Sequence, residues 1–101
     1  METIVTKEVE KNIVKVIGRV DTVTSAEFQN AISPLCEEDK DLELDCEQME
    51  YIASSGLRVF LTAFKQLNAK GRQLQITHIQ ANIMQVLKMT GFDKFLNLSE
   101  A

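Results

Sequence analysis

Two adjacent serines and a glycine interrupt an otherwise apolar run in the segment YIASSGLR, residues 51–58. An apolar pair precedes them, and a stripe of apolar residues at helical spacing follows. Serines at such a junction have three chemical uses. They can cap a helix, attack a substrate as nucleophiles, or carry a phosphate that the free amides and dipole of the helix N-terminus would stabilise. The local residues favour capping, because serine is a preferred cap in any helix.

A nucleophilic serine is the weakest of the three interpretations. A nucleophile elbow has a glycine two residues before and two residues after its serine. Ile52 stands two residues before Ser54, and Ala53 stands two residues before Ser55, so neither serine meets the pattern. The single histidine, His78, is the only candidate base, and it follows the next predicted strand. The sequence therefore indicates a protein that is not an enzyme.

The composition predicts one soluble domain that spans residues 1–101. The chain is 45% hydrophobic and 26% charged, with one proline and four glycines, which is ordinary for a globular protein. A net charge of −4 without a basic cluster argues against nucleic-acid binding. The charged start, METIVTKEVEKN, lacks the apolar core of a signal peptide, and no run is long enough for a membrane span. We expect a cytoplasmic protein.

The two cysteines, Cys36 and Cys46, predict no special chemistry. They do not form a C-x-x-C pair, and with one histidine in the chain the spacing of a metal site is missing. Free cysteine behaves as a small hydrophobic residue. We therefore expect two reduced, buried thiols and neither a metal nor a cofactor.

The first helix has several start signals in VTSAEF, residues 23–28. Thr24 is placed to cap the helix, and Glu27 three residues later would complete a capping box. Val23 would then pack on Phe28 as a hydrophobic staple. Pro34 lacks an amide hydrogen, so it should kink this helix or end its regular part.

Alternating and helical periodicities predict the remaining elements. A hairpin of strands near residues 3–9 and 13–17 precedes the first helix. After that helix we expect a strand at 42–46, a helix starting in SSGLRVFL, a strand at 74–76, a helix around 83–87 and a last strand at 95–98.

The predicted order is β-β-α-β-α-β-α-β, an α/β fold with a mixed sheet and helices packed on it. Residues 42–76 form a β-α-β unit, so the two strands of this unit should be parallel. The serine pair then lies where a strand ends and a helix begins, the usual place for a functional loop in such folds.

At this point the chain resembles a known family. The segment YIASSGLRVFL is similar to the signature of bacterial anti-sigma factor antagonists, which are single STAS domains, with the approximate pattern Asp-Ser-Ser/Thr-Gly-Leu-Gly. The segments GRVDTVTSAEF, LELDCEQMEYIASSG and QANIMQVLKMTGFDKFLNL resemble other parts of these proteins in the same order. The likeness covers nearly the whole chain and implies a STAS-like mixed β-sheet.

The resemblance implies a regulatory binding protein controlled by phosphorylation. In the family, the unphosphorylated antagonist binds an anti-sigma factor that is also a serine kinase. Phosphorylation of the first serine of the pair, here Ser54 with Ser55 as the fallback, releases the antagonist, and a serine phosphatase restores it. Two residues depart from the pattern, Ala53 for the acid and Arg58 for the second glycine. An alternative is an unphosphorylated STAS scaffold or ligand-binding module in a larger signalling assembly, which Ala53 favours.

We expect the partner to contact the serine loop, the first turns of the helix after it, and the loop before the first helix. The candidate contact residues are Asp21, Thr22, Ala53, Ser55, Gly56, Leu57 and Arg58. Two roles stay open. Asp21 either caps the first helix or faces the partner. Arg58, four residues after Ser54, either holds the phosphate or is an ordinary surface residue.

Overall fold

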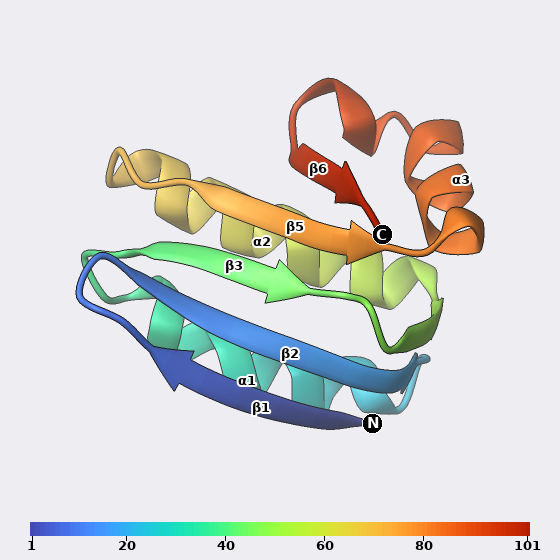
Figure 1. The fold of residues 1–101 in the computed structure, drawn as a ribbon, viewed down its shortest axis with the longest axis horizontal. Coiled ribbons are helices and arrows are strands. Elements are labelled where there is room, and N and C mark those ends of the chain that lie inside the picture. The colour runs from blue at the N-terminus through green and yellow to red at the C-terminus, as the bar shows by residue number, and fades with distance from the viewer.

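The computed structural model describes residues 1–101 as one mixed sheet with three α-helices (Figure 1). The elements are β1 (Glu2–Lys7), β2 (Lys11–Val20), α1 (Thr24–Cys36), β3 (Asp41–Asp45), β4 (Met49–Ile52), α2 (Ser54–Ala69), β5 (Leu74–Ile79), α3 (Ala81–Met89), a 3-10 turn η1 (Phe92–Lys94) and β6 (Asn97–Glu100). The helices are too short and too polar to cross a bilayer.

The sheet has the strand order β1-β2-β3-β5-β6, with β1 antiparallel to β2 and the other pairs parallel. The mixed sheet is confirmed, and so is the parallel β-α-β unit, because Leu42 of β3 lies opposite Leu74 of β5. Figure 1 shows α1 and α2 behind the sheet, the other face uncovered, and α3 beyond the carboxyl end of β5. The carboxyl ends of β2, β3 and β5 therefore share one edge.

The structure adds one strand to the predicted order, which becomes β-β-α-β-β-α-β-α-β. The ten residues of β2 are long enough for two successive neighbours: β3 pairs with Lys11–Lys15, and β4 pairs with Gly18–Val20. The sequence of β4, MEYI, is short and does not alternate apolar and polar residues, so it has no strand signal of its own. The last strand also begins two residues later than predicted, because η1 precedes it.

The start of α1 differs from the predicted capping box. The carboxylate oxygen Oδ1 of Asp21 accepts hydrogen bonds from the amides of Val23 and Thr24, at 3.0 and 2.9 Å. The Thr24 hydroxyl lies 2.8 Å from the carbonyl oxygen of Arg19 and 3.0 Å from Oδ1 of Asp21, and it does not close a box with Glu27. The side chain of Val23 is 78% exposed, so the predicted staple is wrong as well. The carboxylate of Asp21, three residues before Thr24, therefore binds free amides at the helix start in place of the predicted cap.

The predicted helix ends agree with the structure. Helix α1 continues only two residues past Pro34, to Cys36. Beyond α2 and α3, Gly71 and Gly91 have positive φ angles of 72° and 81°, a conformation that glycine adopts without steric cost.

One hydrophobic core lies between the sheet and the two helices behind it. Phe28 of α1 and Phe60 of α2 meet edge to face with ring centroids 5.9 Å apart. The uncovered face of the sheet carries polar pairs, among them the ammonium group of Lys11 and the carboxylate of Glu43 at 2.9 Å. One face of the sheet is apolar and the other carries charged pairs, so only the apolar face is covered by helices.

Both cysteines are buried and free, as predicted. Burial raises the pKa of the Cys36 thiol to about 11 and that of Cys46 to about 12, from an ordinary value of 9.0. We expect neither thiol to react with Ellman's reagent at pH 8 in the folded protein, and both to react in guanidinium. The stability that depends on neutral thiols is complete below pH 9 and is lost as pH rises through the folded-state pKa values. Rapid labelling of native protein would contradict this.

Candidate functional site at the serine pair

Neither serine caps α2. The helix begins at Ser54, and its N-cap residue is Ala53, whose backbone is extended and whose side chain makes no capping bond. The amides of Gly56 and Leu57 both donate to the carbonyl of Ala53, at 2.9 and 3.1 Å, while the amides of Ser54 and Ser55 have no partner in the chain. The capping interpretation is therefore wrong, and two free amides remain at this helix end.

The two hydroxyls lie in different environments. Ser54 is exposed, and its hydroxyl forms no hydrogen bond. Ser55 is half-buried, and its Oγ lies 2.7 Å from Oγ of Ser25 on α1. Only Ser54 presents an unengaged hydroxyl to solvent.

Gly56 allows α2 to approach the strands closely. A Cβ atom at this position would lie 2.7 Å from Cγ1 of Ile52 and 2.8 Å from Cγ1 of Val20. Leu57, the next residue, is buried in the core. In this conformation Gly56 and Leu57 hold the helix against the sheet, and the exposed residues beside them form the surface.

The loop before α1 and the loop before α2 lie side by side. Besides the contact between the two serines, the amide of Ala53 donates to the carbonyl of Val20 at 2.8 Å. The guanidinium of Arg19 lies over the ring of Tyr51, 4.4 Å from its centroid. These contacts follow from the parallel pairing of β2 with β4, which ends both strands at the same edge.

Asp21 shapes its own loop. Its carboxylate accepts hydrogen bonds from Thr24 and Val23, and the bonds from the backbone and side chain of Thr24 are the main cause that lowers its pKa. Thr22 and Val23 are left as the exposed tip of the loop. The structure therefore gives Asp21 a capping role, one of the two roles that the sequence left open.

Arg58 is exposed and lies one helical turn after Ser54. Its guanidinium forms neither an ion pair nor a hydrogen bond, so it is free to meet a group on the same helix face. We call the exposed residues Thr22, Val23, Ser54 and Arg58 the serine patch.

His78 does not combine with either serine. Its Nδ1 lies 3.3 Å from Oδ1 of Asp45, on the neighbouring strand. The hydroxyl of Ser55 contacts that of Ser25, and the hydroxyl of Ser54 forms no hydrogen bond. A serine–histidine arrangement for nucleophilic catalysis is therefore not formed in this structure.

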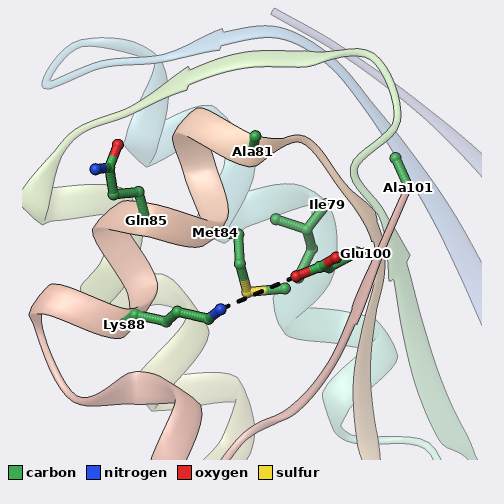
Figure 2. Close-up of a pocket in the computed structure, with 7 residues that line it drawn as sticks. All are labelled: Ile79, Ala81, Met84, Gln85, Lys88, Glu100 and Ala101. Atoms are coloured by element: carbon green, nitrogen blue, oxygen red, sulfur yellow. Dashed lines mark ion pairs between the residues drawn. The ribbon is translucent and has the colours of Figure 1, made fainter.

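The larger of two cavities has a volume of about 330 Å³ (Figure 2), and its lining includes no residue of the serine patch. It opens beside α3 and the end of β6. Met84, Ile79 and Ala81 line it together with Lys88 and Glu100, whose charged groups are 4.0 Å apart. The serine patch is an open surface, which suits a macromolecular partner better than a small ligand.

Comparison with known families identifies the fold. The sequence model of the STAS domain family matches residues 3–101 of this chain. The chain belongs to the STAS domain family.

Relatives of this STAS domain include proteins named anti-sigma factor antagonists. The anti-sigma-B factor antagonist of Bacillus subtilis is 26% identical over 94 residues, which cover 92% of this chain and 86% of that protein. An anti-sigma factor antagonist from Mycobacterium paratuberculosis superposes with a TM-score of 0.89 at 22% identity, over 99% of this chain and 86% of the other.

The antagonist SpoIIAA has been solved in two states with the same fold as this STAS domain. Its unphosphorylated form matches with a TM-score of 0.78 over 99% of this chain and 89% of SpoIIAA. The phosphorylated form from Bacillus matches with 0.74 over 96% and 90%. Both are 14% identical to this chain, so the likeness shows the fold.

Sequence reasoning located the serine pair but missed the residue that distinguishes its members. Ser25 lies directly after Thr24, inside the helix-start motif, and carries no signal beyond that motif. Its contact with Ser55 spans 30 positions. Only the packing of α1 beside α2 brings these hydroxyls together.

Proposed function

We propose that this STAS domain is an anti-sigma factor antagonist that binds a serine-kinase anti-sigma factor when unphosphorylated and is released when that kinase phosphorylates Ser54. The observation that carries the proposal is the exposed, unbonded hydroxyl of Ser54 at the start of α2, beside a half-buried Ser55. The named relatives support the same role. The protein acts in the cytoplasm as a binding protein, and a serine phosphatase returns it to the binding state.

The physical basis of the switch is charge. A phosphate on Ser54 adds about −1.5 to −2 charges and three acceptor oxygens to the serine patch. The free amides of Ser54 and Ser55 and the positive end of the helix dipole stabilise this charge on the antagonist itself. A partner surface that is complementary to the neutral Ser54 side chain then faces a negatively charged phosphate.

The test combines partner capture with site mapping. Tagged wild type, Ser54→Ala and Ser54→Asp are incubated with an extract of the organism that encodes the protein, with and without ATP. Without ATP we expect wild type and Ser54→Ala to retain a serine kinase and Ser54→Asp to lose it. With ATP, phosphate should appear on Ser54 of wild type, which then releases the kinase, while Ser54→Ala stays unmodified and bound. Ser55→Ala is the matched control and should be modified like wild type. Phosphate only on Ser55 would contradict the assignment.

The alternative, an unphosphorylated scaffold or ligand-binding module, has two observations in its favour. Ala53 replaces the acid of the family pattern, and the cavity beside Lys88 and Glu100 is separate from the serine patch. This alternative predicts a stable complex that contains no kinase, and an intact mass that ATP and extract leave unchanged.

Arg58 gives a further prediction. Its guanidinium, one turn from Ser54, should form charge-assisted hydrogen bonds with the phosphate. An exposed pair of this kind contributes about 0.3–1 kcal/mol, with the doubled phosphate charge favouring the upper end. Phosphorylation should therefore raise Tm more in wild type than in Arg58→Gln, by a few degrees at low salt and less at high salt.

Lys65→Gln is the control for the Arg58 experiment, because it removes a cation from the exposed face of α2 about 16 Å along the helix from Ser54. It should retain the full wild-type response. Equal shifts in wild type and Arg58→Gln would make Arg58 an ordinary surface residue.

A further inference from the structure

The contact between Ser25 and Ser55 joins the N-terminal turns of α1 and α2. Ser25 is buried, at 6% exposure, and the two hydroxyl oxygens are 2.7 Å apart. Besides contacting Ser55, the hydroxyl of Ser25 donates to the carbonyl oxygen of Asp21, one turn earlier in the chain.

The hydrogen bond from Ser25 to the carbonyl of Asp21 determines which serine is the donor in the contact between Ser25 and Ser55. A serine hydroxyl has one proton, and Ser25 uses its proton on the carbonyl of Asp21. In the contact between the serines, Ser25 must therefore accept and Ser55 must donate. The Ser55 hydroxyl is turned toward α1, and its proton is engaged by a buried acceptor.

From this geometry we propose that Ser25 is a positioning residue that restricts phosphorylation to Ser54 by holding the hydroxyl of Ser55 against α1. The inference rests on the proposed function and extends it by assigning the residue that selects the acceptor. In phosphoryl transfer, the bond from Ser54 Oγ to the γ-phosphorus of ATP forms and the bond from phosphorus to the β,γ-bridging oxygen breaks. ADP leaves, and the hydroxyl proton passes to a base of the kinase.

Ser55 fails the requirements of this step while its bond to Ser25 persists. The acceptor oxygen must lie in line with the γ-phosphate and must release its proton to the kinase. The oxygen of Ser54 is accessible and unbonded, while that of Ser55 is half-buried and points to the neighbouring helix. The same bond ties together the two loops that flank the serine patch, so modification of Ser54 alone leaves that connection intact.

The experiment maps phosphate by mass spectrometry after incubation with ATP and an extract of the native organism. Wild type should carry phosphate on Ser54 only, and Ser54→Ala should carry none. In Ser25→Ala the ratio of phospho-Ser55 to phospho-Ser54 should rise at least about tenfold, and Ser25→Ala/Ser54→Ala should be modified on Ser55. Ser25→Thr keeps a hydroxyl and should restore the wild-type pattern, whereas a purely structural role would move Tm and leave the site distribution unchanged.

Ser33→Ala is the matched control, since it removes a half-buried hydroxyl from α1 far from the start of α2, and phosphate should stay on Ser54. If Ser25→Ala does not fold by circular dichroism, the nearly isosteric Ser25→Cys carries the same expectation, because a thiol is a weak acceptor. Phosphate confined to Ser54 in folded Ser25→Ala or Ser25→Cys, or found on Ser55 as well as Ser54 in wild type, overturns the inference alone. Absence of phosphate from every variant overturns the proposed function, and this inference with it.

Discussion

Phosphorylation of Ser54 should weaken binding of the anti-sigma partner by about 100-fold, and Ser54→Glu should weaken it by about tenfold. A charge placed in an interface that fits a neutral side chain costs several kcal/mol unless it is paired, and each 1.4 kcal/mol is a factor of ten in Kd. The phosphate introduces up to about twice the charge of a glutamate at the same position. Ser54→Ala should bind with nearly the wild-type affinity, because it removes a hydroxyl that has no partner in the free protein.

The measurement is an isothermal titration of the purified partner with each variant at two salt concentrations. Asn68→Glu is the matched control, since it places the same charge on an exposed position of α2 about 21 Å along the helix from Ser54. That distance exceeds the Debye length of about 8 Å at physiological salt, so Asn68→Glu should bind like wild type. If Ser54→Glu and Asn68→Glu bind equally well, the serine patch is not the contact surface.

Replacement of Gly56 by alanine should destabilise the fold, because forcing a methyl group into a packed interior usually costs about 1–3 kcal/mol. The new Cβ would lie within 2.8 Å of side-chain carbons on both Ile52 and Val20. Alanine is the better helix former by about 1 kcal/mol, which offsets part of the cost. The net loss is then up to about 2 kcal/mol, and each kcal/mol lowers the Tm of a domain of this size by about 4–8 °C.

A double-mutant cycle with Val20→Ala isolates the steric cause. Removing the methyl groups of Val20 takes away one of the two clashing atoms, so Gly56→Ala should cost less in the Val20→Ala background than in wild type. Thermal melts of the four proteins measure this difference. Strict additivity would show that the contact with Val20 is not a cause of the loss.

The sequence alone determined the layer structure and the location of the site. Apolar periodicity reports which side of each element faces a core, so the hairpin, the three helices and the parallel β-α-β unit followed from local patterns. The placement of YIASSGLR at the end of a strand and the start of a helix followed from the same reasoning. The resemblance to the antagonist family then supplied the expectation of a STAS domain, which the match over residues 3–101 confirmed.

Features that depend on several elements at once were decided only by the tertiary structure. Strand β4 exists because β2 extends beyond β3 and offers unpaired backbone groups, which no pattern in MEYI reports. Asp21 caps α1 because its loop folds back over the free amides.

The difference between Ser54 and Ser55 was also decided only by the tertiary structure. Local pattern treats Ser54 and Ser55 as equivalent hydroxyls. Their environments differ because Ser25, 30 positions before Ser55, is brought next to Ser55 when α1 packs beside α2. A hydroxyl has no periodic signature, since its hydrogen bond depends on the one neighbour that the fold provides. The sequence therefore marks the serine pair, and the packing of two helices leaves Ser54 as the serine whose hydroxyl is free.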